Sequence, residues 1–394
     1  MYVNARTFLP ALAVAVAAWF APPAPARAES DAPEDSSAVA AVPAPASLSQ
    51  PPAPASAGNL LNPNLSVIGW FQAEAGDRVA EAGGEAFALR EVEIGLQAAV
   101  DPYSRADFFI GVSPEEGIDI EEGYLTLLSL PYGLAAKLGK FRGSFGKFNR
   151  THPPETPFAD RPLAAERFLG EEGLAGMGAS ASWLVPLPFY LNLDAEVTNT
   201  PSRDEVPSFE AYSGEDLLYT TRLGAFVELG EAANLTLGAS YANGANGAAA
   251  SDTTAAPPTD PDVLRSQLQG ADVTFRWKNP RRAIYRSLVL SAEAYRRDAE
   301  TGDASGHVAR GGFAYADYQF SRRWHAGGRY DWSEELDAPD RHATGGLAFL
   351  AFSPSEFSLM SLQASRRWLE DGADETRCYL KVTFNIGPHG AHPF

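Results

Sequence analysis

The chain has 394 residues, with 50 acidic and 31 basic side chains and a formal net charge of -19. This acidic balance argues against a nucleic-acid-binding protein, which would need a basic face. Cys378 is the single cysteine, so an intrachain disulfide is excluded, and scarce cysteine is consistent with an exported protein. We expect Cys378 to be a small apolar residue on a strand.

The N-terminus has the pattern of an export signal. Arg6 precedes an apolar run from Phe8 to Phe20, and a Pro-rich stretch follows that ends in Ala26-Arg27-Ala28. A positive start, a short apolar core and an A-x-A site predict a secretory signal peptide over residues 1–28. An N-terminal membrane anchor is the alternative, but the run of about 13 residues is shorter than the roughly 20 that a spanning helix needs.

Residues 29–58 are mostly Ala, Pro and Ser with a few acids. This composition cannot bury a core, so we predict a disordered linker. The remaining residues, 59–394, form the predicted folded domain.

From residue 59 onward, segments of about 10 to 16 residues alternate apolar and polar side chains, with turn residues between them. A period of two places the two sets on opposite faces of a β-strand. In the clearest segment, one set is Phe189, Leu191, Leu193, Ala195 and Val197, and the other is Tyr190, Asn192, Asp194, Glu196 and Thr198.

About sixteen such segments are present, and four of them (64–75, 117–129, 307–320 and 341–353) alternate poorly, so the strand count carries a margin of two. An even number of antiparallel strands with apolar residues outside and polar residues inside is typical of outer-membrane barrels. We therefore predict an all-β protein, a transmembrane antiparallel β-barrel. The predicted strands are 64–75, 86–101, 103–113, 117–129, 132–142, 172–185, 188–199, 215–230, 232–243, 264–278, 283–298, 307–320, 322–334, 341–353, 355–369 and 374–387.

A soluble β-sandwich or barrel would also show alternation. Its dry interior would have to bury the charged side chains of the polar set, at a cost of several kcal/mol for each unpaired charge. If the polar set of each strand (its polar parity) faced outward instead, about sixteen strands would enclose an apolar space too wide for side chains to fill. A water-filled lumen removes both difficulties. On this interpretation the lumen-facing residues include Lys137, Arg222, Arg276, Arg329, Asp194 and Glu196.

One stretch leaves the strand pattern for roughly 25 residues and is rich in Pro, Arg and aromatic side chains. Residues 137–167 contain seven Lys and Arg against three acids, in a chain that is acidic as a whole. We predict that 143–170 folds into the lumen and narrows the pore, where basic side chains favour anions. An ordinary external loop with solvated charges is the alternative. The candidate constriction residues are Arg142, Lys147, Arg150, Arg161 and Arg167.

The motif Gly139-Lys140-Phe141-Arg142, followed by Phe145-Gly146, resembles a strand end of the phosphate-selective O/P-type porins. The later stretches Asp160-Arg161-Pro162-Leu163 and Gly170-Glu171-Glu172-Gly173-Leu174, and the C-terminal residues 386–394, resemble plugless porin-like barrels, some of them labelled TonB-dependent receptors. The resemblance covers about residues 59–394 and implies a bacterial outer-membrane diffusion channel, often a homotrimer. Phosphate selectivity is not implied, because the lysine and arginine ladder of the O/P-type porins is not evident.

We therefore predict a porin-like channel for passive diffusion of small hydrophilic solutes or ions, with a weak preference for anions. The alternatives are a receptor or transporter for a scarce nutrient such as a metal complex, and a structural or adhesion barrel. We expect no enzymatic activity, because no nucleophile motif such as G-x-S-x-G is present, and no cofactor, metal or nucleic acid. The expected surroundings are outer-membrane lipid.

Overall fold

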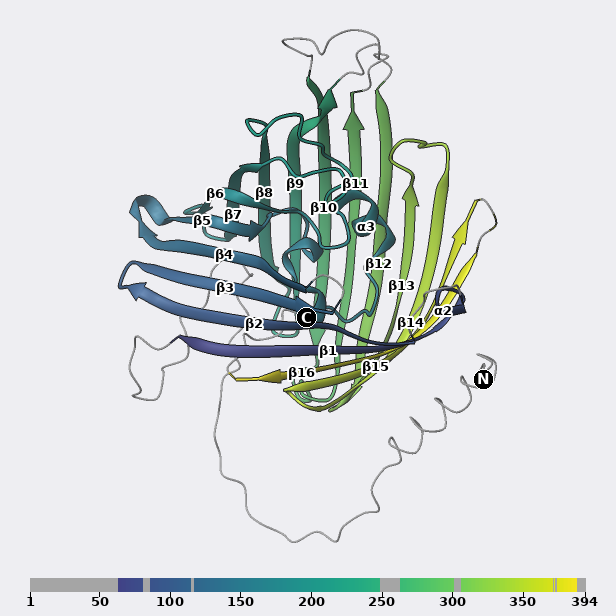
Figure 1. Cartoon of the computed structure of the whole chain (residues 1–394). Coiled ribbons are helices and arrows are strands. Elements are labelled where there is room, and N and C mark those ends of the chain that lie inside the picture. The colour runs from purple at the N-terminus through teal and green to yellow at the C-terminus, as the bar shows by residue number, and fades with distance from the viewer. Residues whose placement is uncertain are drawn as a thin grey trace, which may run out of the picture.

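The computed structural model describes residues 63–80, 86–114, 117–248, 263–300, 306–370, 372 and 374–387. Sixteen strands form one closed barrel, in which β1 pairs with β16 (Figure 1). This arrangement confirms the predicted fold and strand number. The first eight strands are β1 (Asn64–Gly76), β2 (Phe87–Asp101), β3 (Ser104–Ser113), β4 (Gly117–Leu130), β5 (Leu134–Arg142), β6 (Ala175–Leu184), β7 (Tyr190–Asn199) and β8 (Leu217–Glu228). The last eight are β9 (Ala233–Ala248), β10 (Val263–Lys278), β11 (Ser287–Ala299), β12 (His307–Ser321), β13 (Trp324–Glu334), β14 (His342–Ser355), β15 (Ser358–Leu369) and β16 (Glu375–Ile386).

Each strand is antiparallel to the strands before and after it in the chain, and the closing pair β1–β16 has Trp70 opposite Thr383. Closure leaves no strand edge, so every backbone ladder is satisfied within the sheet, as a membrane requires. The helical elements are short: α2 (Asp77–Ala80), α3 (Leu163–Leu169) and the 3-10 turns η1 (Pro131–Gly133), η2 (Phe148–Arg150) and η3 (Pro153–Glu155). In the described part of the chain, no helix has the length and apolar character to cross a membrane.

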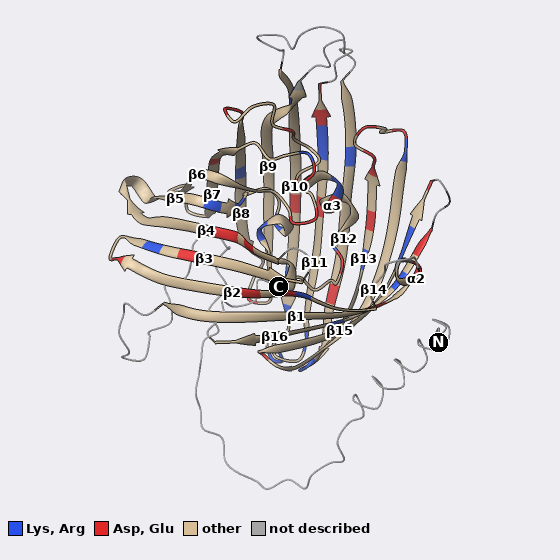
Figure 2. Ribbon diagram, in the orientation of Figure 1, with Lys and Arg blue, Asp and Glu red and all other residues tan. Residues whose placement is uncertain are grey.

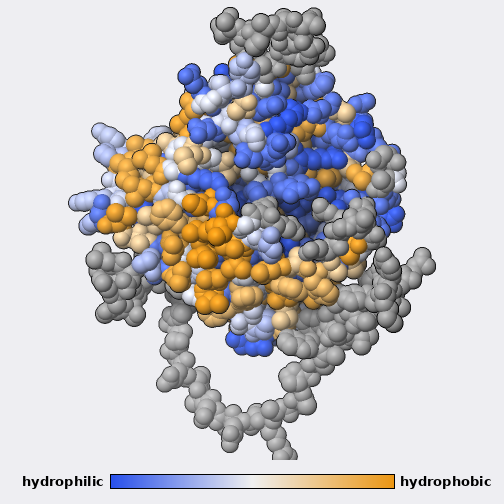
Figure 3. Space-filling view, in the orientation of Figure 1, coloured by the Kyte–Doolittle hydropathy of each residue, from blue (hydrophilic) through white to orange (hydrophobic). Residues whose placement is uncertain are grey.

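The outer face of the barrel is apolar. Large side chains of the outward parity, such as Leu138, Leu223 and Phe384, are exposed. Figure 3 shows hydrophobic residues gathered over β1–β4. Apolar surface of this extent marks contact with lipid or another protein. Cys378 lies on the same parity of β16 as Leu380 and Val382, as expected of a small apolar residue.

The inner face carries the polar parity. Asn192, Asp194, Glu196 and Thr198 of β7 are buried, whereas Leu193 and Ala195 between them are exposed. Figure 2 shows charged residues at intervals along many of the strands. The expectation that water alone solvates these charges is wrong in part, because several are buried in ion pairs. Arg222 Nη1 lies 2.6 Å from Asp272 Oδ2, and both side chains are at most 4% exposed.

Trp70 is an aromatic residue that faces the interior of the barrel. Its side chain is on the inward parity of β1 and is buried, and Lys381 Nζ lies 4.6 Å from the centre of its ring. The predicted signal peptide (1–28) and linker (29–58) lie outside the described residues.

Candidate pore constriction

Between β5 and β6, residues 143–174 cross the interior of the barrel, and we call them the inward segment. Asn149 closes its base: its side-chain Nδ2 donates to the carbonyl oxygens of Gly143 and Leu174, and its Oδ1 accepts the N–H of Leu174 at 2.7 Å. The segment contains η2, η3 and α3, with Pro153 and Pro154 beginning η3. Proline at the start of a helical turn sacrifices no hydrogen bond there. Asn149 therefore holds the two ends of the segment together, and the two prolines favour the turn between them.

The segment is joined to β11 through Glu293. One oxygen of this buried carboxylate, Oε1, accepts the backbone N–H groups of Lys147 and Phe148 at 2.9 and 2.6 Å. The other oxygen accepts the hydroxyl of Tyr295 at 2.7 Å. Two backbone donors of an irregular segment are thus satisfied by the wall.

A second set of contacts joins the segment to β13, β15 and β16. Lys381 Nζ donates to the carbonyl oxygens of Pro153, Thr156 and Phe158 at 2.8 to 3.2 Å. Arg329 Nη2 lies 3.2 Å from Asp160 Oδ2. β13 and β16 lie two and five places from β11, the strand that bears Glu293, so these bonds extend the attachment of the segment around the wall.

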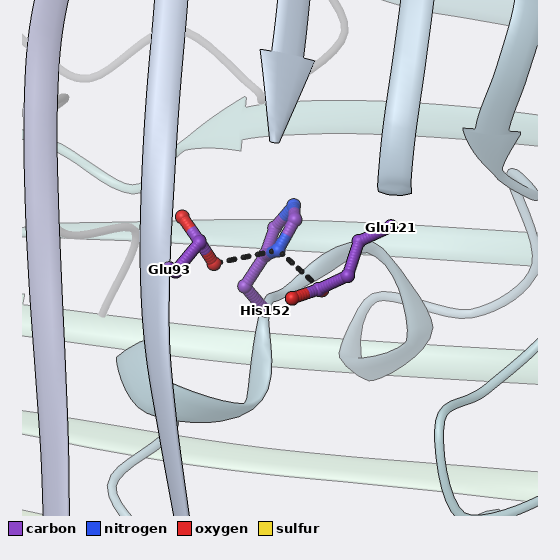
Figure 4. A group of neighbouring side chains, drawn as sticks. All are labelled: Glu93, Glu121 and His152. Carbon is purple, nitrogen blue, oxygen red and sulfur yellow. Dashed lines mark hydrogen bonds and ion pairs between the residues drawn. The ribbon is translucent and has the colours of Figure 1, made fainter. Parts of the chain in front are cut away.

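A third set joins the segment to β2 and β4. His152 Nδ1 lies 2.9 Å from Glu93 Oε2 and 3.1 Å from Glu121 Oε2 (Figure 4). Its Nε2 lies 2.7 Å from Glu122 Oε1. Burial disfavours the charged ring, but the charge of Glu93 and the hydrogen bonds with Glu121 and Glu122 outweigh it, and the pKa of His152 lies well above its usual range.

Apolar side chains fix one side of the segment to the wall. Phe145, Phe158 and Phe168 are at most 1% exposed. They pack against inward-facing residues of β8 to β14, which the alternation pattern had assigned to a polar lumen. The whole cluster is Phe145, Phe148, Phe158, Ala164, Ala165, Phe168, Leu169, Leu174, Val206, Phe209, Leu218, Ala242, Leu268, Tyr295, Ala309, Phe313, Tyr315, Leu336, Leu347, Phe349 and Ala351.

Residues 200–216, between β7 and β8, also reach this cluster. Val206 and Phe209 are at most 1% exposed, and Arg297 Nε donates to the Ser208 carbonyl oxygen at 3.3 Å. A Cβ atom on Gly170 would overlap the carbonyl oxygen of Glu205. The two inner segments therefore pack backbone to backbone.

On the opposite side, a cavity of about 360 Å³ separates the inward segment from the wall of β1, β2, β15 and β16. Its charged lining is asymmetric: most of the carboxylates belong to the inward segment, and most of the arginines belong to the strands. The carboxylates are Glu74, Asp160, Glu166, Glu171 and Glu172, and the arginines are Arg90, Arg161, Arg367 and Arg377. This cavity is the candidate passage for solutes.

The predicted constriction residues point to different parts of the interior. Arg161 lines the candidate passage. Arg142 is buried 2.8 Å from Glu121, and Arg150 lines a smaller cavity of about 110 Å³ beside β7. Arg167 Nη1 donates to the Ser333 carbonyl oxygen at 2.9 Å. The wall residues Arg90, Arg367 and Arg377 were not predicted. Arg367 directly follows Arg366, and the pair by itself does not indicate which of the two faces inward.

Lys147 and Arg161 illustrate the electrostatics of the segment. Burial lowers the pKa of Lys147, and the nearby charge of Arg276 lowers it further against the opposing effects of Glu293 and Asp272. Burial and the charge of Arg142 likewise lower the pKa of Arg161, but a guanidinium still stays charged at neutral pH. Arg161 therefore keeps its positive charge over a wider range of pH than Lys147 does.

The predicted lumen-facing residues lie on the inward parity of their strands, mostly in buried pairs. Lys137 Nζ lies 4.4 Å from the centre of the Tyr124 ring. Arg329 Nε donates to Asp331 at 2.8 Å, and Glu196 accepts the N–H of Ser144 at 2.9 Å. Asp194 accepts a hydrogen bond from Asn192 at 2.9 Å. Arg276 is half-buried on β10.

Sequence comparison finds a relative in Aquifex aeolicus (strain VF5), an uncharacterized protein that is 33% identical over 339 residues, covering 78% of this chain and 70% of the relative. The chain belongs to the family of this Aquifex protein. No family model matches the sequence.

Solved structures of bacterial outer-membrane proteins have the same fold as this chain. OprB of Pseudomonas putida has a TM-score of 0.56 at 11% identity, covering 82% of this chain and 94% of that chain. An anion-selective porin from Comamonas acidovorans has a TM-score of 0.55 at 11% identity, covering 82% and 99%. A loop-deletion mutant of OmpT, an outer membrane protein of Vibrio cholerae, has a TM-score of 0.55 at 8% identity, covering 82% and 99%. The barrel is thus of the bacterial outer-membrane porin type, while the finer resemblances to O/P-type porins and to TonB-labelled barrels stay predictions.

Proposed function

We propose that this protein is an outer-membrane channel through which small hydrophilic solutes and ions diffuse passively. The observation that carries the proposal is the cavity of about 360 Å³ beside the inward segment, lined by charged side chains inside a closed barrel. An apolar exterior and a charged interior suit lipid on one side of the wall and water on the other. The bacterial outer membrane is the location that this arrangement fits.

The inward segment is the proposed constriction. It is bonded to β4, β11, β13 and β16, so it narrows the interior at a fixed position. Five carboxylates and four arginines line the proposed passage. Because these charges nearly balance, we propose weak charge selectivity, and the predicted preference for anions stays a proposal that ion-selectivity measurements decide.

The proposed assembly is a homotrimer. OmpT of Vibrio cholerae, a structural neighbour at 9% identity with a TM-score of 0.51, has been solved in a trimer form. The exposed apolar face over β1–β4 offers a surface for such contacts. Native mass spectrometry of the detergent-solubilised protein would test this assembly, and a uniform monomer would contradict it.

The decisive experiment is reconstitution of the purified chain into a planar lipid bilayer. A diffusion channel gives stable conductance steps that increase linearly with voltage and with salt concentration. Liposomes that contain the protein should also swell in small sugars and not in large polymers. A correctly folded barrel that yields neither conductance steps nor swelling would contradict the proposal.

A further inference from the structure

His152, Glu93 and Glu121 direct three potential ligand atoms at one point between the inward segment and the wall. The imidazole comes from the inward segment, and the carboxylates come from β2 and β4 (Figure 4). Their ligand atoms all lie within 4.8 Å of one another. We propose that these three residues bind a divalent first-row transition-metal ion, which joins the segment to β2 and β4.

The hydrogen bonds of His152 assign its ligand nitrogen. Nε2 lies 2.7 Å from Glu122 Oε1, and the other oxygen of Glu122 accepts the backbone N–H of Arg142 at 3.0 Å. Glu122 is therefore fixed and takes the hydrogen on Nε2. Metal-binding histidines commonly donate their second ring N–H to a carboxylate in this way. The metal would then take the place of the hydrogen that Nδ1 carries in the charged ring, and this proton would be released on binding.

Nδ1 then faces two carboxylate oxygens at once, Glu93 Oε2 at 2.9 Å and Glu121 Oε2 at 3.1 Å. At metal–ligand distances of about 2.1 Å, adjacent ligands lie about 3.0 Å apart in an octahedron and about 3.4 Å apart in a tetrahedron. The two separations from Nδ1 fit adjacent octahedral positions.

Glu93 gives a second indication. It is 4% exposed and its Oε2 lies 2.9 Å from His152 Nδ1, yet this oxygen accepts no hydrogen bond from any described residue. A single hydrogen on Nδ1 serves only one of the two carboxylates, and it bonds to Glu121. Leaving a charged, buried oxygen without a donor costs more than about 1–3 kcal/mol. A cation at the shared point would serve both carboxylates.

The surrounding charge also favours a divalent cation. Glu91 lies within hydrogen-bonding distance of Glu121, and this contact needs one proton between the two carboxyl groups. The pair and the carboxylates of Glu93 and Glu122 therefore contribute three negative charges around one imidazole. The guanidinium of Arg142 contacts this group of carboxylates, 2.8 Å from Glu121. A cavity of about 120 Å³, lined by Glu91 and Glu121 among others, adjoins the site and leaves room for water ligands. A nitrogen ligand favours first-row transition metals over Ca²⁺ and Mg²⁺, which prefer oxygen.

The test is Co²⁺ binding to the tag-free, full-length protein in detergent after treatment with EDTA. His389 and His392 near the C-terminus are replaced by alanine throughout, so that they do not contribute. Calorimetry should give one Co²⁺ per chain, and visible absorption should show weak octahedral bands. Absence of stoichiometric binding would overturn the proposal, as would displacement of Co²⁺ by an equal concentration of Ca²⁺.

Glu93→Gln is the informative variant, because it keeps the size of the side chain and removes only the charge that faces His152 Nδ1, while Oε2 accepts no hydrogen bond. It should weaken Co²⁺ binding by at least about tenfold. Glu196→Gln is the matched control, because Glu196 is another buried carboxylate that contacts the inward segment, at Ser144, and it should bind as the parent does. Unchanged affinity in Glu93→Gln would overturn the assignment. If that variant does not fold, Glu93→Asp tests the same point, since it keeps the charge but withdraws the oxygen, and it too should lose affinity.

Discussion

Glu293 on β11 accepts the backbone N–H of Phe148 at 2.6 Å, although 145 positions separate the two residues in the chain. The same carboxylate accepts the N–H of Lys147 and the hydroxyl of Tyr295. A single side chain of the wall thereby fixes the start of η2 inside the barrel. The position of the inward segment thus depends on a few long-range bonds from buried wall residues.

Glu293→Ala should detach this part of the inward segment. The change leaves two backbone N–H groups and one hydroxyl without their acceptor, and each unsatisfied group costs about 1–3 kcal/mol. The barrel should remain folded by gel mobility with and without heating, while trypsin should cleave after Lys147 or Arg150 more quickly than in the parent. Cleavage at the parental rate would show that other contacts hold the segment.

Gly170→Ala should weaken the contact between the two inner segments. Gly170 has φ 83° and ψ 171°, a region that is essentially restricted to glycine, and an added Cβ would overlap the Glu205 carbonyl oxygen. The free energy of unfolding should fall by about 1–3 kcal/mol in urea titrations in detergent. Gly224→Ala is the control, because nothing lies within 4 Å of a Cβ atom there, and an equal loss in both variants would contradict the packing.

Arg367→Glu should change ion selectivity. Arg367 lines the candidate passage and lies 2.9 Å from Glu166, so reversing its charge makes the passage more negative. The reversal potential across a salt gradient should shift toward cation preference. The neighbouring Arg366 is on the outer parity of β15 and contacts Asp374, so Arg366→Glu alters net charge equally and should leave the reversal potential unchanged. Equal shifts in the two variants would remove this cavity from the conduction path.

Arg222→Ala should destabilise the barrel more than removal of an exposed arginine does. It leaves Asp272 as a buried charge without its partner, for which losses of about 3–5 kcal/mol are typical. Arg296→Ala removes a pair with Asp298 in which both side chains are more than two-fifths exposed, and such pairs contribute about 0–1 kcal/mol. Urea unfolding of both variants measures the difference, and similar losses would mean that water solvates Asp272 after the change.

The four segments that alternate poorly have structural explanations. In β12 and β14 the inward parity carries apolar residues such as Phe313 and Phe349, which pack against the inward segment, so both faces are apolar. In β1 the inward Trp70 has the same effect. In β4 the pairing shifts between Ile120 and Glu122, which inserts Glu121 and interrupts the period of two.

The sequence by itself determined the barrel, a strand number of about sixteen with a margin of two, and the outward side of the strands that alternate clearly. These follow from a period-two pattern that is local to each segment, because alternate side chains point to opposite faces. Only the tertiary structure decided which inward residues meet water, which meet each other and which hold the inward segment. Those contacts join residues such as Lys381 and Phe158, which are 223 positions apart. A local pattern of polarity contains no information about such partners, because the partner depends on how the closed barrel arranges the other strands and the segment within it.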